Sequence, residues 1–390
     1  TCKVTLQLSD CLYVLLYNNL QNAVPSFNML LLILVSLTIS TFSLLSLRKV
    51  ALAFGLVDKP DVRKRHQGDV PFIGGISLFI TLTAVSLISP ELIPNRDYFL
   101  VCGLILTCIG TLDDKLDINA KTRLILLCAI SVCLVLTKNI SLTNLGDLFG
   151  QGDVVLSYGD TLLTTAAVIG CISAFNMVDG IDGLLGALAS VAFGALAFLF
   201  YSAGNTQLTI FCIIFITSLF PYILFNLDLI PKRSFKVFMG DSGSFLIGFT
   251  IIWLIIHSSQ KVDGGALVPI MKPVTALWII ALPLMDMVIV MMRRIRKGKS
   301  PLKPDRLHLH HICTRLGLSF RQTLMLLFTI SSCLALFGVW GQMSDKPESI
   351  MFLLFLSAFL IYILIMNNIW RFTVFARKAK TKISTSSTIS

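Results

Sequence analysis

Three polar residues lie in a short turn between two apolar segments that are each long enough to be buried in lipid. Asn176, Asp179 and Asp182 are three residues apart, so any helical backbone would place them roughly on one face. Gly180 and Gly183 let the chain turn sharply and let a ligand approach closely. Two carboxylates in so apolar a chain indicate a functional site. The structural alternative is that Asp182 caps the following helix and Asp179 only lies in the turn.

A second acidic cluster forms a DDxxD pattern at Asp113, Asp114 and Asp117. Adjacent carboxylates repel each other unless a cation lies between them. Mg²⁺ bound by one or two carboxylates together with substrate phosphates is the usual arrangement. The alternative is a solvated acidic loop whose charge is balanced by the Lys and Arg residues that follow it.

The segment Lys236–Ser244 precedes another apolar helix. Asp241 is expected to cap that helix, and Gly243 and Ser244 would offer backbone N–H groups to an anion. Capping does not explain Phe238, an aromatic residue beside a polar loop that could stack on a nucleotide base. The segment is therefore interpreted as both a helix start and a candidate nucleotide contact.

Three histidines, His308, His310 and His311, lie in a long basic loop. No Cys or Glu accompanies them at zinc-binding spacing, so phosphate binding is favoured over zinc. Arg294 and Arg306 could make bidentate contacts to a diphosphate. The alternative for these two residues is the ordinary positive charge of a cytoplasmic loop.

Asp286 lies inside an apolar segment, about two turns before Arg293. An acid at such a place is a functional candidate by default, and pairing with a neighbouring helix is the structural alternative. Gly74 and Gly75 are interpreted as helix-packing glycines.

The elements that must position these residues are membrane helices. Of the 390 residues, 55% are hydrophobic and only 14% are charged, and the mean hydropathy is +0.83. A soluble protein of this length could not bury so much apolar surface, so we expect an all-α polytopic integral membrane protein with about eleven transmembrane helices. The apolar segments are 28–47, 71–89, 98–112, 123–137, 162–175, 184–203, 208–227, 242–258, 273–292, 323–342 and 349–370.

Charge predicts the orientation of these helices. With the amino terminus outside and the loops alternating, 26 of the 32 Lys and Arg residues fall on the cytoplasmic side. This bias satisfies the positive-inside rule, with the carboxyl terminus inside. The acidic motifs then all lie on the cytoplasmic side. The net charge of +11 is explained by topology and anionic lipid, so it is no evidence for nucleic acid.

Three regions are expected along the chain. Residues 1–28 are more polar and irregular, lack the features of a signal peptide, and are assigned to an N-terminal extension. Residues 29–375 form the transmembrane domain, and residues 376–390 form a basic, then Ser/Thr-rich cytoplasmic tail that we expect to be disordered at its end. Most of the ten cysteines lie in apolar segments without zinc-binding spacing, so no disulfide framework is expected.

The motifs together resemble the polyprenyl-phosphate N-acetylhexosamine-1-phosphate transferase superfamily, also called the glycosyltransferase 4 family. The resemblance covers roughly residues 29–375 and rests on several patterns in order: GLVDKPxxRKRHQG, GGIS, LDDxxD, AFNMVDGIDGL, KVFMGDSGS, PVTALWII, PLMDM and PDRxHxHH. A branch that makes peptidoglycan lipid I tends to carry three consecutive histidines in the last loop. The interrupted run here favours the branch that uses UDP-N-acetylglucosamine.

The resemblance implies a reaction, its partners and its location. UDP-N-acetylglucosamine and undecaprenyl phosphate would give undecaprenyl-diphospho-N-acetylglucosamine and UMP, with Mg²⁺ or Mn²⁺, at the cytoplasmic face of the bacterial inner membrane. The product would enter enterobacterial common antigen or O-antigen lipopolysaccharide synthesis. A groove between helices, open to lipid, would hold the prenyl chain. A homodimer is left open.

The resemblance also implies roles for the residues singled out above. Asp241 would hold the metal together with Asp114, and Phe238 would stack on uracil. Asp113 and Asp114 are assigned either to metal binding or to deprotonating the lipid phosphate, and Asp113 is the predicted base. Further catalytic roles fall to Asp179, Asp182 and His308. Substrate contacts are expected from Asn176, Arg294, Arg306, His310, His311 and Asp117.

Two kinds of alternative function remain at this point. One is a related transferase that uses another UDP-aminosugar or UDP-N-acetylmuramoyl-pentapeptide. The other is an ion-coupled transporter, which also has many helices and buried acids. Transporters place coupling carboxylates near the bilayer midplane, whereas only Asp286 approaches that depth here.

Overall fold

All eleven predicted apolar segments are helical in the computed structural model. The structure describes residues 29–58, 68–138, 140–156, 158–229, 235–260, 269–301 and 307–386. Side chains are described as far as residue 368, except at 137–138. The first apolar segment is the helix Met29–Phe54. The others are α2 (Gly74–Ile88), α3 (Arg96–Leu116), α4 (Ala120–Lys138), α5 (Asp160–Val178), α6 (Leu184–Ser202), α7 (Thr206–Asn226), α8 (Gly240–Ser259), α9 (Pro273–Ile279) with α10 (Ala281–Arg296), α12 (Phe320–Met343) and α13 (Glu348–Ser386).

Fewer helices are long enough to cross a membrane than there are predicted apolar segments. Among the described residues, seven helices are long and apolar enough to cross a membrane, and eight if α9 and α10 form one span bent by 79°. Helix α2 has only 15 residues, and α3 and α4 carry charged ends. The chain is therefore a multi-pass helical membrane protein, and the total of eleven spans and their orientation stay predictions.

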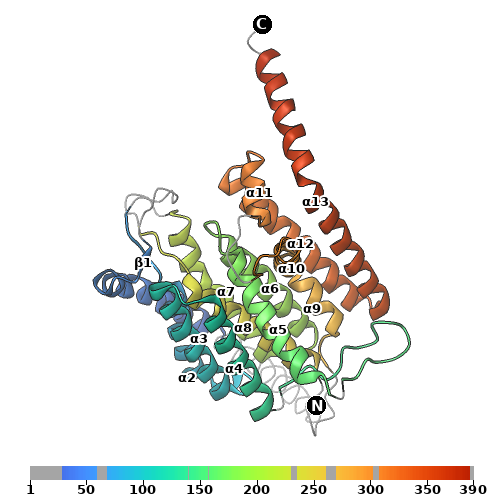
Figure 1. Cartoon of the computed structure of the whole chain (residues 1–390). Helices are drawn as coiled ribbons and strands as arrows, with labels where there is room; N and C mark the ends of the chain where they lie inside the picture. Colours follow the sequence, from blue (N-terminus) through green and yellow to red (C-terminus); the bar gives the residue numbers. More distant parts are fainter. Residues whose placement is uncertain are drawn as a thin grey trace, which may run out of the picture.

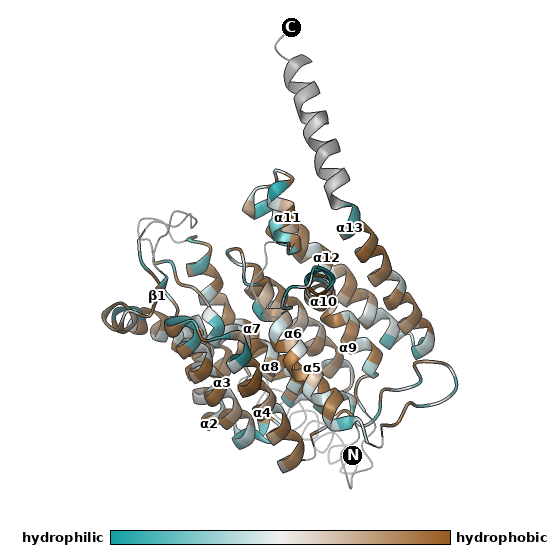
Figure 2. Ribbon diagram, in the orientation of Figure 1, coloured by the Kyte–Doolittle hydropathy of each residue, from teal (hydrophilic) through white to brown (hydrophobic). Residues whose placement is uncertain are grey.

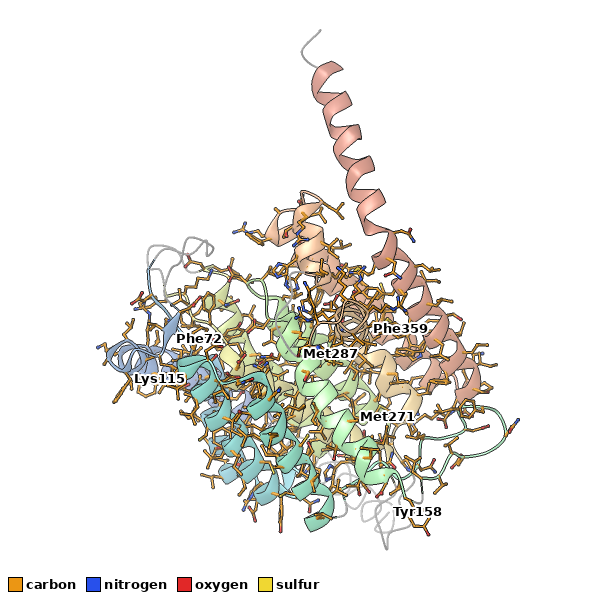
Figure 3. The ribbon with its side chains drawn as sticks, viewed as in Figure 1. Phe72, Lys115, Tyr158, Met271, Met287 and Phe359 are labelled. Carbon is orange, nitrogen blue, oxygen red and sulfur yellow. The ribbon has the colours of Figure 1, made fainter. Side chains whose placement is uncertain are left out.

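The helices form one bundle with two distinct ends (Figure 1). The hairpin of β1 (Val57–Asp58) and β2 (Val70–Pro71), the short helix α11 (Leu309–Arg315) and the projecting part of α13 lie at one end. The loop between α4 and α5 lies at the other. Figure 2 shows hydrophobic residues along the body of the bundle and hydrophilic residues concentrated towards its ends. Figure 3 places Phe72 and Lys115 at the end with the hairpin, far from Tyr158.

Helix α8 is the centre of the bundle, because almost every residue along it is buried. It contacts α2, α3, α5, α6 and α9. Small residues allow this close packing: a Cβ on Gly75 of α2 would overlap the backbone nitrogen of Gly243, and a Cβ on Gly110 of α3 would overlap the backbone of Ser242. The prediction that Gly75 is a packing glycine is confirmed. The start of α8 is thus fixed between two neighbouring helices.

The loop before α8 pairs with the start of α2. The backbone N–H of Phe238 donates to the carbonyl of Pro71 at 2.9 Å, and the N–H groups of Gly74 and Gly75 donate to the carbonyls of Phe238 and Met239, both at 3.0 Å. The first N–H groups of a helix have no partner within it, so these bonds satisfy donors that would otherwise be buried without an acceptor. They hold the loop in one place.

The chain beyond α12 departs from the sequence prediction. Helix α13 continues through Ser386, past the predicted apolar segment that ends at 370. The expectation of a disordered end is therefore wrong for residues 383–386. Residues 1–28 and 387–390 lie outside the part of the chain that the structure describes.

Candidate active site

Three acidic motifs that are far apart in the sequence meet at the start of α8. The backbone N–H of Asp241 donates to Oδ1 of Asp114 at the end of α3, at 2.8 Å. The side-chain amide of Asn176, near the end of α5, donates to Oδ1 of Asp241 at 2.6 Å and to the Ser244 hydroxyl at 2.9 Å. The ends of α3 and α5 and the start of α8 therefore share one site, as the sequence predicted for these motifs.

Arg123, at the beginning of α4, lies between two of the carboxylates. Its guanidinium contacts Oδ2 of Asp113 at 2.9 Å and Oδ2 of Asp241 at 3.5 Å. The other oxygen of Asp113 accepts the backbone N–H of Ile118 at 2.8 Å, and the Asp113 side chain is buried. Both oxygens of Asp113 are thus occupied, so a role as base requires Arg123 to release it.

Asp179 completes the acidic cluster. Its side chain is exposed, and the surrounding protein partly desolvates its carboxyl group. This desolvation, followed by the charges of Asp241 and Asp182, raises the pKa of the Asp179 carboxyl to about 7. The Asp179 carboxyl therefore holds a proton more readily than an isolated surface aspartate does.

Neither the cap expected at Asp241 nor the cap considered as an alternative role for Asp182 is present. The N-cap of α6 is Gly183, with φ +77°, and Asp182 instead forms an ion pair with the Lys236 ammonium at 2.6 Å. The N-cap of α8 is Met239 without a side-chain cap, and Asp241 lies one residue inside the helix. In both cases the carboxylate is directed to another segment of the site. The structural alternative for Asp182 and Asp241 thus loses its main support.

Phe238 lies beside the acidic cluster on the loop before α8. Its ring centroid is 5.9 Å from that of Phe72, with the planes inclined by 39°, and the Lys236 ammonium lies 5.4 Å from its centroid. The backbone bonds to β2 and α2 fix this loop. Phe238 is therefore an aromatic residue held next to carboxylates and a cation, the combination that a base and its phosphates require.

The histidines belong to a distant part of the sequence, at the start of α11, and they pack against the acidic turn. His308 and His310 are buried with their rings parallel within 4°, and the His310 and His311 centroids are 4.2 Å apart. A Cβ on Gly180 would overlap Nε2 of His310, so this ring packs directly on the turn that carries Asp179. Burial, followed by His311, lowers the pKa of His310 to about 3, although Asp286 opposes this shift. The ring is therefore neutral at physiological pH.

Other predicted site residues lie farther from the carboxylates or cannot be placed. Arg294 is buried at the end of α10, where its Nε donates to the carbonyl of Ser300 at 2.6 Å. Asp117 is exposed at the C-cap of α3, with φ 51°. Arg306 and its neighbour Asp305 lie outside the described residues.

Several residues that shape the site were not assigned a role from the sequence. Arg123 and Lys236 were treated as ordinary positive charge, yet each pairs with a site carboxylate. Asn226, buried at the end of α7, accepts the N–H of Gly183 at 2.5 Å and donates to the carbonyl of Val237 at 2.8 Å. It ties two site loops together. The position of Arg123 shortly after the DDxxD pattern could have predicted its role, whereas no local sequence pattern points to Asn226.

The carboxylates suit a divalent cation. Oδ2 of Asp114 is buried without a hydrogen-bond partner in the described part of the chain, and Arg123 is the cation seen between Asp113 and Asp241. Within the described residues, no three His, Cys, Asp or Glu side chains already form a ligand set for a metal. Mg²⁺ is usually held by one or two carboxylates with substrate phosphates, so Asp114 and Asp241 fit such an ion.

Gly180→Ala tests the contact between the histidine loop and the acidic turn. The added methyl group would push the His310 ring away, because it overlaps Nε2 and would lie 2.6 Å from Cε1. We expect the protein to fold and its catalytic activity to fall about 10-fold or more, since displacement by about 1 Å is costly at an active site. Gly159→Ala, at the start of α5 with open space around the glycine, is the control and should retain activity. Equal activity of the two variants would contradict the contact.

Comparison with known proteins assigns the chain to a family. Residues 97–259 match the sequence model of Glycosyl transferase family 4. A protein of Yersinia pestis named undecaprenyl-phosphate alpha-N-acetylglucosaminyl 1-phosphate transferase is 45% identical over 337 residues, which is 86% of this chain and 91% of that protein. The chain belongs to glycosyl transferase family 4.

Further proteins of the same name are similar over most of their length. The one from Escherichia coli O157:H7 is 44% identical, covering 88% of this chain and 92% of that protein. The one from Haemophilus influenzae is 40% identical, covering 87% and 94%. The family resemblance stated from the motifs is thereby confirmed.

Proposed function

We propose that the protein transfers N-acetylglucosamine-1-phosphate from UDP-N-acetylglucosamine to undecaprenyl phosphate, releasing UMP. The observation that carries this proposal is the meeting of Asp114, Asn176 and Asp241 from three helices at one end of the bundle. Relatives named for this activity share 40–45% of their residues with the chain.

The chemistry explains why such a site is needed. The lipid phosphate must attack the β-phosphorus of the nucleotide sugar, and both reactants are anions. Positioning and positive charge supply most of the catalysis in such a transfer. Arg123 and Lys236 lie among the carboxylates, and Arg294 lies at the end of α10. A divalent ion bound through Asp114 and Asp241 would neutralise the diphosphate.

Individual roles follow from the contacts. Asn176 orients Asp241 through its amide, and Arg123 holds Asp113 and Asp241 close together despite their like charge. Asp179 and Asp182 line the turn on which a sugar phosphate would rest. We keep Asp113 as the base for the lipid phosphate. In that role Asp113 is freed when the substrate phosphate takes over the contact with Arg123.

A cavity in the bundle suits the prenyl chain. It has a volume of about 380 Å³ and lies between α5, α8, α9 and α10, with almost exclusively apolar lining such as Ala167, Ile252 and Met287. It extends away from the acidic site to Leu142 and Leu145 in the loop between α4 and α5. The bend of 79° between α9 and α10 occurs at its wall. An isoprenoid is apolar and flexible, so such a cavity would accept part of it without any polar partner.

Phe238→Ala tests the nucleotide contact. Base stacking on an aromatic ring contributes about 1–3 kcal/mol, so we expect UDP-N-acetylglucosamine to bind about 10- to 100-fold more weakly. Binding of undecaprenyl phosphate should change little, because the lipid has no base. Calorimetry with UDP-N-acetylglucosamine and a lipid-binding assay in detergent would measure both. Equal weakening of both ligands would contradict the stacking role.

The orientation that we propose places the site on the cytoplasmic side of the bacterial inner membrane. The positive-inside rule favours this arrangement. In a cysteine-free background, Tyr158→Cys should react with a membrane-impermeant maleimide in spheroplasts, whereas Lys299→Cys should not. Both residues are exposed and lie in loops of opposite predicted side. Labelling of Lys299→Cys alone would reverse the orientation.

The sugar is decided by product analysis. Purified protein, undecaprenyl phosphate and Mg²⁺ would be incubated separately with UDP-N-acetylglucosamine, UDP-N-acetylgalactosamine and UDP-N-acetylmuramoyl-pentapeptide, and the lipid product identified by mass spectrometry. We expect undecaprenyl-diphospho-N-acetylglucosamine as the main product. A muramoyl-pentapeptide lipid instead would assign the chain to the other branch of the family.

A further inference from the structure

Asp286 is a buried acid that the proposed chemistry has not yet used. It lies in α10 and is only 3% exposed. Its Oδ2 is 2.8 Å from Nδ1 of His308, and its Oδ1 accepts the backbone N–H of Leu309 at 3.0 Å and the hydroxyl of Tyr362 at 2.8 Å. Three donors from the start of α11 and from α13 thus converge on one carboxylate.

These contacts determine which ring nitrogen of His308 remains available for a contact with substrate. An ionised carboxylate only accepts hydrogen bonds, so Nδ1 of His308 must carry the proton in the bond to Asp286. In the neutral ring Nε2 is then the acceptor. The bond to Leu309 fixes the backbone at the same point, because His308 is the N-cap residue of α11. Both the ring and its attachment are held by one side chain.

The histidine loop fixed in this way contacts the acidic turn. The His310 ring lies parallel to that of His308, with centroids 5.7 Å apart, and packs on Gly180 beside Asp179. Any shift of the start of α11 would therefore be transmitted to the place where phosphates are expected. Tyr362 connects this arrangement to α13, which also packs against α10 and α11.

We propose that Asp286 is a positioning residue, which together with Tyr362 fixes the tautomer and the place of His308 so that Nε2 faces the transferring phosphates. The inference rests on the proposed function in that His308 acts on the diphosphate. Asp286 itself touches no substrate. A purely structural contact would stabilise the bundle, but its loss would not lower kcat through His308.

Asp286→Asn is the main test. The amide has nearly the same size, but it can accept hydrogen bonds only through one atom and presents donors at the other, so at least one existing donor loses its acceptor. We expect kcat to fall about 10- to 100-fold, as for other carboxylates that orient a functional histidine. The affinity for UDP-N-acetylglucosamine, measured by calorimetry, should stay within about twofold. Tyr362→Phe should lower kcat in the same direction by a smaller factor.

A double-mutant cycle separates positioning from general support. If Asp286 acts through His308, the variant Asp286→Asn/His308→Ala should be no slower than His308→Ala alone. Multiplication of the two single effects would overturn the inference. Asp345→Asn is the matched control, because that carboxylate is 90% exposed and pairs with Lys272 in a loop away from the site. Thermal unfolding in detergent verifies that each variant is folded.

A spectroscopic measurement decides the inference independently of turnover. ¹⁵N-histidine NMR of the purified protein should show His308, assigned by its absence in His308→Ala, protonated at Nδ1, and Asp286→Asn should shift it towards protonation at Nε2. An unchanged tautomer in Asp286→Asn would overturn the inference. If the wild-type protein releases no UMP but the tautomer shifts as expected, the proposed function fails while the role of Asp286 stands.

Discussion

Asp241→Asn is expected to lower the rate of UMP release by a factor of ~10³ or more while leaving the protein folded. Asp241 receives the Asn176 amide, contacts Arg123, and donates its backbone N–H to Asp114, so it lies at the centre of the cluster. The substitution keeps the size of the side chain and can keep one of its two acceptor contacts, with Asn176 or with Arg123, but it removes one of the charges that would hold a divalent ion. Repulsion among the remaining carboxylates falls, so the unfolding temperature should be unchanged or higher.

The control for this variant is Asp97→Asn. Asp97 is the second residue of α3, its side chain is 77% exposed, and it forms an ion pair with the adjacent Arg96 at 2.7 Å. Its replacement should leave UMP release within about twofold, as expected for a surface change. Retention of more than a tenth of wild-type activity by Asp241→Asn would show that the start of α8 is not the catalytic centre.

Gly110→Ala is expected to inactivate the enzyme without touching any polar group. A Cβ at this position of α3 would overlap the Cα and nitrogen of Ser242 and would lie 2.6 Å from the carbonyl carbon of Asp241. These are backbone atoms of the central helix, so α3 itself must move. Overpacking of this kind costs about 1–3 kcal/mol. A displacement of about 1 Å would lower the rate about 100-fold, because Asp113 and Asp114 follow Gly110 by one turn.

Gly194→Ala is the matched control for the packing effect. Gly194 lies inside α6 with no atom within 4 Å of an added Cβ, and alanine is the better helix former. UMP release and thermal unfolding in detergent should be equal to or better than in the wild type. A Gly110→Ala protein as active as Gly194→Ala would show that the separation of α3 and α8 does not set the geometry of the site.

Much of the site follows from local sequence because its chemistry is concentrated in short motifs. Asp114, Asn176 and Asp241 were singled out from residue type and spacing and were grouped from the charge pattern and the family resemblance. Their hydrogen bonds confirm that they meet. The helices could also be predicted from the sequence, because a long, continuous apolar run in a membrane can satisfy its backbone hydrogen bonds only as a helix. The break at Ile280 was not predicted, although Pro283, three residues later in the same run, is a signal for it, because proline lacks a backbone N–H and its ring clashes with the preceding turn.

The residues that sequence reasoning misplaced are those whose role depends on a distant partner. Asp241 was expected to cap a helix, and a cap was the alternative for Asp182, since a local cap is what spacing alone suggests. The structure gives them Lys236 and Asn176 as partners instead. Asp286 was left between two interpretations for the same reason, because neither His308 nor Tyr362 can be assigned to it without the fold.

The measurement that tests the account most directly is release of UMP in an omission experiment with purified wild-type protein in detergent. Complete reactions contain UDP-N-acetylglucosamine, undecaprenyl phosphate and Mg²⁺, and parallel reactions lack one component or contain EDTA. We predict UMP and lipid diphosphate sugar in equal amounts in the complete reaction, and neither when the lipid or the metal is absent. UMP released without the lipid, or at the same rate in EDTA, would contradict transfer at a metal-assisted carboxylate site.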